Sequence, residues 1–205
     1  GVWQHPAMRA AALIVVASVL VAGCGAGRHR PATTTSVAKS SAALHRTAVR
    51  AAPPIRRLVA MRAGTLASPI QDAAGARFGG GAVLIGGLTP ADVSSNAIVT
   101  ATRAGSRAVG AIPQALHDSA AVTLGRDTYL FGGGTGTAQI DTILMVDPRT
   151  GAAQAVGHLP AGSSDQSAAA IGGTAYIVGG YTGSHWLDTI LAWSPGRSAR
   201  VVAHL

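Results

Sequence analysis

Short apolar runs separated by glycine-rich and turn-forming segments dominate the chain from residue 66 to residue 205. The runs are five to eight residues long and rich in Val, Ile, Leu and Tyr, as in "TILMV". Runs of this length and composition predict β-strands rather than helices. Residues 25–54, by contrast, show no sustained apolar period, and residues 10–23 form one apolar stretch, "AAALIVVASVLVAG". The pattern therefore divides the chain into an apolar leader, a polar linker and a strand-rich region.

The apolar leader has the features of an export signal. It follows Met8 and Arg9 and ends in small residues, and it is shorter than the about 20 apolar residues that a membrane-spanning helix needs. A basic start, a short apolar segment and small residues before a cleavage point are typical of a secretory signal. We place this signal at residues 8–23 and interpret residues 1–7, "GVWQHPA", as an upstream or non-native segment.

Cys24 is the single cysteine of the sequence. A lone cysteine cannot form an intramolecular disulfide, and the usual place of a free cysteine is a small apolar site in the core. Here, however, the sequence Val21-Ala22-Gly23-Cys24 resembles the lipobox of bacterial lipoproteins. The resemblance implies cleavage before Cys24, acylation of its thiol, and a mature protein that is exported and lipid-anchored at the extracytoplasmic face of the bacterial cell membrane.

The formal net charge of +8 is concentrated upstream of the strand-rich region. Residues 24–65 hold eight basic residues and no Asp or Glu, whereas residues 66–205 hold seven arginines and eight aspartates. The strand-rich region therefore lacks the basic excess that binds a phosphate backbone, and we expect no nucleic-acid partner. The composition of the basic linker, residues 24–54 with the lipidated Cys24, predicts disorder. Beside an anionic leaflet its basic residues would attract the membrane; a plain soluble spacer is the alternative.

The strand-rich region consists of three copies of one unit, at about residues 66–112, 113–159 and 160–205. In each copy a double glycine ends an apolar run, and an aspartate lies 14 residues before its first glycine. Nine residues after that glycine, "DTILMV" and "DTILAW" begin in the second and third copies, and Ser95 occupies this place in the first. The recurring residues are Gly86, Gly87, Gly132, Gly133, Gly179, Gly180, Asp72, Asp118 and Asp165.

Each copy contains four apolar runs with turn signals between them, such as "GRD" and "DPRTG". Four strands in every roughly 40–50 residues are typical of a β-propeller blade. The double glycine after an apolar strand, followed by Tyr or Trp and a "DP" turn, resembles the kelch repeat family. The resemblance covers residues 66–205 and implies an all-β propeller of four-stranded kelch-like blades, about three of which are present.

Three blades do not close a ring, because propellers typically have four to eight and open sheet edges invite pairing. We therefore expect an incomplete ring from a longer protein, for which the kelch resemblance implies about six or seven blades. A complete chain of this length would instead have to oligomerise or remain an open stack. Within the folded region, taken as residues 55–205, we predict that residues 55–66 add an outer strand to the last blade.

The recurring residues have structural roles in this interpretation. Glycine permits positive φ and the close approach of a neighbouring strand, and the segment "GGGTGTAQ" lacks the Lys-Ser/Thr of a phosphate-binding loop. The aspartates are expected to accept hydrogen bonds from backbone N–H groups at the start of each inner strand, as Asx residues do in turns. A ligand-binding role for these aspartates is the alternative.

One face of the predicted propeller collects the candidate ligand-binding residues. Because neighbouring strands run in opposite directions, the loop before the first strand and the loop between the second and third strands of each unit lie on the same side. Exposed aromatic and hydrogen-bonding groups there would suit a protein, glycan or small ligand. The candidates are Gln71, His117, Gln166, Thr135, Gln139, Tyr181, His185 and Trp186, together with the three recurring aspartates.

Binding rather than catalysis is the predicted function. The seven histidines form no HxH or HExxH spacing, and the sequence contains no Glu, so we predict no metal site, no cofactor and no catalytic residue in these units. The alternative is a fragment of a propeller enzyme, because kelch-type propellers include copper radical oxidases and sugar epimerases. An oxidase site requires Tyr, His and Cys ligands, and the sole Cys24 is assigned to the anchor, so the catalytic residues would lie in further blades.

Overall fold

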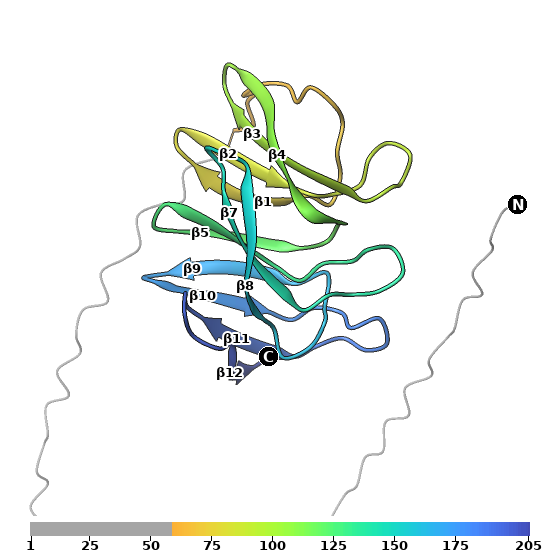
Figure 1. Cartoon of the computed structure of the whole chain (residues 1–205), viewed down its shortest axis with the longest axis vertical. Coiled ribbons are helices and arrows are strands. Elements are labelled where there is room, and N and C mark those ends of the chain that lie inside the picture. Colours follow the sequence, from red (N-terminus) through yellow and green to blue (C-terminus); the bar gives the residue numbers. More distant parts are fainter. Residues whose placement is uncertain (1–58) are drawn as a thin grey trace, which may run out of the picture. The chain divides into compact units, whose positions relative to one another are not determined.

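A computed structural model of the chain describes residues 59–205 (Figure 1). The predicted signal at 8–23, the lipidated Cys24 and the linker at 24–54 lie outside the described residues, as do residues 55–58. Residues 59–205 contain no helix, and hence none with the length and apolarity that a membrane span requires.

The described chain forms three four-stranded antiparallel sheets, in each of which the strands follow one another in sequence order. Sheet 1 comprises β1 (Ala74–Phe78), β2 (Gly81–Ile85), β3 (Ser95–Thr102) and β4 (Gly105–Leu116). Sheet 2 comprises β5 (Ala120–Leu124), β6 (Asp127–Phe131), β7 (Thr142–Asp147) and β8 (Ala152–His158). Sheet 3 comprises β9 (Ser167–Ile171), β10 (Thr174–Val178), β11 (Thr189–Trp193) and β12 (Arg200–His204).

The three sheets pack one against the next in sequence order, with their first strands side by side (Figure 1). Strand β1 contacts β5 and β5 contacts β9, while β4 contacts β8 farther out. Such four-stranded sheets, repeated with their first strands adjacent, are consistent with the blades of a β-propeller. The prediction of an all-β fold built from four-stranded units is confirmed.

Two apolar cores hold the sheets together, because each sheet buries its side chains against its neighbour rather than within itself. Between sheets 1 and 2, residues such as Ile85 and Ile98 pack against Leu130. Between sheets 2 and 3, Trp193 packs against the rings of Tyr129 and Phe131, with ring centroids 4.9 and 5.5 Å apart. Aromatic pairs at these separations contribute about 0.5–1.5 kcal/mol beyond the area that they bury.

The double glycines lie where β2, β6 and β10 end, and those after β2 and β6 approach the backbone that leads to the next sheet. Both glycines of each pair have positive φ, for example 55° at Gly132 and 119° at Gly133. A Cβ atom on Gly132 would lie 2.4 Å from the carbonyl oxygen of Ser163, in the segment leading to sheet 3. Positive φ and this close approach both require glycine.

One detail of the predicted repeat is wrong. The backbone N–H of Gly86 donates to the carbonyl of Ala97, as that of Gly132 donates to Thr142, so Asn96 rather than Ser95 occupies the place of Asp141. The loop of sheet 1 is therefore one residue longer than those of the other sheets. In the three described sheets, residues 59–66 form no strand, and residues 63–66 lie against the turns of sheet 1. The closing strand at 55–66 therefore stays a prediction.

Candidate binding face

The connections between strands lie on two opposite sides of the sheets. We call the side with the segments before β1, β5 and β9 and the loops β2–β3, β6–β7 and β10–β11 the loop face, and the side with the short hairpin turns the turn face. In Figure 1 the longer loops project to the right, and the β9–β10 turn points to the left. Because all three sheets stack in the same orientation, the predicted candidate residues come from one face.

The three recurring aspartates link the sheets at the loop face through their backbones. The N–H of Asp118 donates to the carbonyl of Asp72 at 3.0 Å, and the N–H of Asp165 donates to that of Asp118 at 2.9 Å. All three have positive φ, between 52° and 59°, a conformation that Asp tolerates better than most residues. The predicted Asx bonds from their carboxylates to backbone N–H groups are not formed among the described residues; backbone N–H and C=O groups connect the sheets here instead.

The carboxylates of these aspartates are close enough to affect one another. Burial, together with the negative charges of Asp165 and Asp72, raises the pKa of Asp118, and His117 opposes this shift. Sheet 2 thus places its aspartate between two others, one on each neighbouring sheet. In residues 59–205 no group of three or more His, Cys, Asp or Glu side chains has the geometry of a metal site.

His117 connects two loops at the boundary of sheets 1 and 2. Its Nδ1 atom shares a hydrogen bond of 2.8 Å with the hydroxyl of Ser94, in the β2–β3 loop. Its Nε2 atom lies 3.8 Å from a carboxylate oxygen of Asp118. Sequence spacing did not predict the participation of Ser94, because this serine is 23 residues from His117 and is brought to it only by the packing of the sheets.

Gln166, predicted to face a ligand, is instead buried, with 6% of its surface exposed. Its Nε2 donates to the carbonyl of Phe131 on sheet 2 at 2.7 Å, which fixes sheet 3 against its neighbour. Gln71 remains exposed and donates to the carboxylate of Asp92 at 3.3 Å. Gln166 thus belongs to the sheet interface and Gln71 to the accessible face.

The β6–β7 and β10–β11 loops share one backbone conformation. In the first, Thr135 donates through both its N–H and its hydroxyl to the carbonyl of Ala138. In the second, Thr182 makes the same two bonds to the carbonyl of His185. The glycine after each threonine has a φ of 92° or 93°. Such internal hydrogen bonds give both loops a defined shape.

The two matching loops differ in the side chains that they present. Tyr181 and Trp186 face each other across a single bridge in the β10–β11 loop, with ring centroids 4.8 Å apart. Trp186 has 71% of its surface exposed. Gly134 and Gln139 form the equivalent bridge of the β6–β7 loop. Because the loop adopts its shape without aromatic residues in sheet 2, the shape alone does not account for the aromatic pair of sheet 3.

Two equivalent His–Asp pairs lie at the rim of the loop face. The Nδ1 of His158 hydrogen-bonds the carboxylate of Asp141 at 3.1 Å, and His204 pairs with Asp188 at the same distance. Sequence reasoning missed these pairs, although the recurrence of a histidine 17 or 16 residues after the aspartate was a usable signal. The pairs join the third and fourth strands of sheets 2 and 3.

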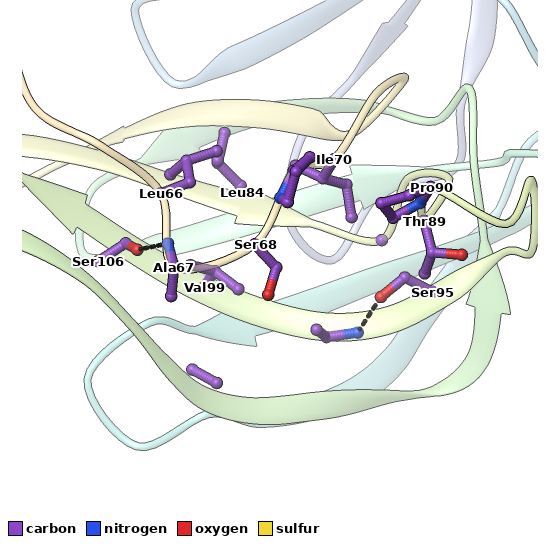
Figure 2. Close-up of a pocket in the computed structure, with 14 residues that line it drawn as sticks. Leu66, Ala67, Ser68, Ile70, Leu84, Thr89, Pro90, Ser95, Val99 and Ser106 are labelled. Atoms are coloured by element: carbon purple, nitrogen blue, oxygen red, sulfur yellow. Dashed lines mark hydrogen bonds between the residues drawn. The ribbon is translucent and has the colours of Figure 1, made fainter.

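A separate apolar pocket of about 410 Å³ lies beneath residues 66–70 on sheet 1 (Figure 2). Leu66 and Ile70 cover it, and Leu84 and Val99 line its floor. The N–H of Ala67 donates to the hydroxyl of Ser106 at 2.8 Å, which ties the covering segment to β4. Leu84 and Val99 are paired across β2 and β3, as Leu130 and Leu144 are paired across β6 and β7 in the next repeat. In sheet 2 this pair packs against sheet 1. The pocket therefore occupies a place where, elsewhere in the fold, a neighbouring sheet packs.

Comparisons with known proteins bear on the fold alone. No protein-family model matches the sequence, and no curated protein matches it. The fold is similar to the solved structure of YjhT, with a TM-score of 0.58 and 15% sequence identity. The similarity covers 68% of this chain and 52% of YjhT, so the chain spans about half the length of that protein.

Proposed function

We propose that this chain is part of an exported, lipid-anchored kelch-like propeller that binds a protein, carbohydrate or small ligand through its loop face. The observation that carries this proposal is the pair of the half-buried Tyr181 and the exposed Trp186, on a loop whose shape is fixed by its own hydrogen bonds. A large aromatic surface that is exposed and preorganised loses little conformational entropy on binding, and such residues are common binding hot spots. Ser184 and His185 beside it supply hydrogen-bonding groups.

The matching loop of sheet 2 provides the test. The double variant Tyr181→Gly/Trp186→Gln gives the β10–β11 loop the residues of the β6–β7 loop at the bridge. The full chain would be screened against glycan and peptide arrays, and the variant measured against any ligand found. We expect affinity to fall at least tenfold with an unchanged circular dichroism spectrum. Equal binding by the variant would exclude this pair from the ligand site.

The membrane anchor is a separate part of the proposal and rests on the lipobox-like sequence that ends at Cys24. Expression in a bacterial host with labelled palmitate is expected to label the protein, and the Cys24→Ala variant is expected to remain unlabelled. Labelling that survives this substitution would refute acylation at Cys24 without affecting the binding proposal.

The kelch assignment and the incomplete ring are also proposals. The double glycines in register with the aspartates support the assignment to the kelch family. The exposed apolar residues of sheet 3, Ile171 and Leu205 among them, support a further sheet against it, supplied by additional blades or by a second copy of the chain. Native mass spectrometry of the full chain distinguishes a monomer from an oligomer that supplies the cover.

A propeller enzyme of epimerase or oxidase type is the second candidate, and one observation favours enzymatic chemistry. Ser94, His117 and Asp118 form a chain of hydroxyl, imidazole and carboxylate at the loop face. A hydroxyl bonded to an imidazole is a common element of acid–base and nucleophilic sites. Turnover of an array-identified sugar or ester that is lost in His117→Ala would support this candidate; binding without turnover supports the first.

A further inference from the structure

Most positive and negative side chains of the three sheets lie on opposite faces. Seven arginines occupy the turn face, at strand ends or in hairpin turns, and all seven are exposed: Arg77, Arg103, Arg107, Arg126, Arg149, Arg197 and Arg200. Six of the eight aspartates occupy the loop face: Asp72, Asp92, Asp118, Asp141, Asp165 and Asp188. Within residues 66–205 the loop face carries no Lys or Arg. The three sheets therefore have a total charge near zero but a negative loop face and a positive turn face.

Only two aspartates, Asp127 and Asp147, accompany the arginines on the turn face. Asp147 forms an ion pair with Arg149, whose Nε and Nη2 atoms donate to its two carboxylate oxygens at 3.1 and 3.0 Å. This pair lowers the pKa of Asp147. The arginines at the tips of other turns, Arg103, Arg126 and Arg197, make no side-chain hydrogen bond or ion pair within residues 59–205, so their charges are free for an external partner.

The described chain enters the fold at the same face. Residues 63–66 line a hollow together with Gly80 of the β1–β2 turn and Arg103 of the β3–β4 turn. Arg62, one residue earlier, donates to the hydroxyl of Thr65 at 2.9 Å. Earlier in the sequence, residues 24–58 hold seven basic residues and no acidic one. Chain entry and positive charge therefore coincide at the turn face.

We propose that the turn face docks on an anionic lipid surface, with the loop face directed away from it. The inference goes beyond the ligand-binding proposal, because it concerns the opposite face. Arginines spread over separate turns of three sheets match a flat anionic surface, and each basic residue near such a surface strengthens binding by about fivefold. A single-stranded nucleic acid fits this face less well, because its bases stack on exposed aromatic rings, and the turns carry none among residues 66–205.

The aspartates of the loop face do not oppose this docking. A five-residue strand such as β1 separates the two faces, and at about 3.3 Å per residue it spans roughly 17 Å. Charges in solution are screened over about 10 Å at 0.1 M salt. The lipid surface would therefore attract the arginines without strongly repelling the aspartates.

The test measures co-sedimentation of the full chain with vesicles, using a Cys24→Ser background so that no acyl chain contributes. The vesicles contain phosphatidylcholine alone or a mixture with phosphatidylglycerol. The variant Arg103→Gln/Arg126→Gln/Arg197→Gln removes one exposed turn charge from each sheet. We expect its affinity for the anionic vesicles to fall by about 100-fold at low salt, as three fivefold steps require, with an unchanged circular dichroism spectrum.

The matched control changes three charges on the other face. Asp92→Asn/Asp165→Asn/Asp188→Asn raises the net charge by as much as the arginine variant lowers it, and we expect the affinity to stay within about twofold. If the aspartate variant instead binds much more tightly, binding follows net charge and no docking face exists. If the arginine variant binds like the parent, the upstream basic segment binds alone, and the proposal is wrong. Equal binding to both kinds of vesicle would also overturn it.

Discussion

Sheets 2 and 3 carry apolar residues at the same repeat positions, but within residues 59–205 a following sheet covers only those of sheet 2. Leu124 of β5 is 8% exposed, whereas Ile171, its counterpart on β9, is 68% exposed. Leu159, just after β8, is 4% exposed, whereas Leu205, just after β12, is 77% exposed. The comparison shows that the repeat specifies an apolar contact side on every sheet, and that burial depends on the next sheet being present.

The largest expected difference in stability between substitutions in sheet 2 and sheet 3 concerns two tyrosines at the same repeat position. Tyr129 is buried against Trp193, whereas Tyr176 is only partly buried. Tyr129→Ala is expected to destabilise the fold by about 3–5 kcal/mol, as large-to-small core substitutions of aromatic residues do. Tyr176→Ala is expected to cost about 1 kcal/mol. Urea unfolding of both variants measures the difference, and equal losses would mean that Tyr176 is covered in solution.

The two leucines give the next comparison. Leu159→Ala is expected to cost about 2–4 kcal/mol, because it leaves a cavity in the core between sheets 2 and 3. Leu205→Ala is expected to change stability by less than about 0.5 kcal/mol, as exposed substitutions do. Thermal unfolding at several protein concentrations provides the check. A large, concentration-dependent effect of Leu205→Ala would show that a second copy covers this residue.

Substitutions of the first glycine of each doublet are expected to differ less in their cost to stability. Gly132 and Gly179 have similar φ values of 55° and 65°, so alanine is strained at both, by about 1–2 kcal/mol. At Gly132 the new Cβ also meets the Ser163 carbonyl at 2.4 Å, whereas at Gly179 its nearest neighbour, the Leu187 carbonyl, is 3.5 Å away. We therefore expect Gly132→Ala to cost at least about 1 kcal/mol more than Gly179→Ala in denaturant unfolding. The reverse order would contradict the close approach of the segment that leads to sheet 3.

The smallest expected difference in stability is between substitutions of Asp118 and Asp165, and it is electrostatic and depends on pH. The raised pKa of Asp118 means that the folded state holds its proton more tightly than the unfolded state. The bound proton therefore stabilises the fold at low pH, and this contribution is lost as the pH rises from about the ordinary value of 3.8 through the raised pKa. Asp118→Asn is expected to remove this loss and to stabilise the protein at pH 7 by a few tenths of a kcal/mol.

Asp165→Asn is the control for this electrostatic effect. Among the described residues Asp165 adjoins one recurring aspartate, Asp118, whereas Asp118 adjoins two. We expect its effect at pH 7 to be smaller than that of Asp118→Asn. Unfolding free energies at pH 4 and pH 7 test both variants. An effect of Asp118→Asn that does not change with pH would rule out carboxylate repulsion as its cause.

The loop face shows where prediction from the repeat succeeded and where it failed. The alternation of strand direction brought the loops of Tyr181 and His117 to one face, because that geometry follows from chain order alone. It placed Gln166 on the surface wrongly, because a side chain that reaches the Phe131 carbonyl of another sheet leaves no local pattern. The bond between Ser94 and His117 was missed for the same reason.

The sequence by itself determined the strands, their four-stranded grouping and the positions of the glycines, since each depends on local periodicity and backbone freedom. It also determined which repeat positions are apolar. Only the tertiary structure decided which of these are buried and which aspartates repel one another. These properties depend on distances between residues that are 20 or more positions apart, and only the packing of one sheet on the next sets those distances.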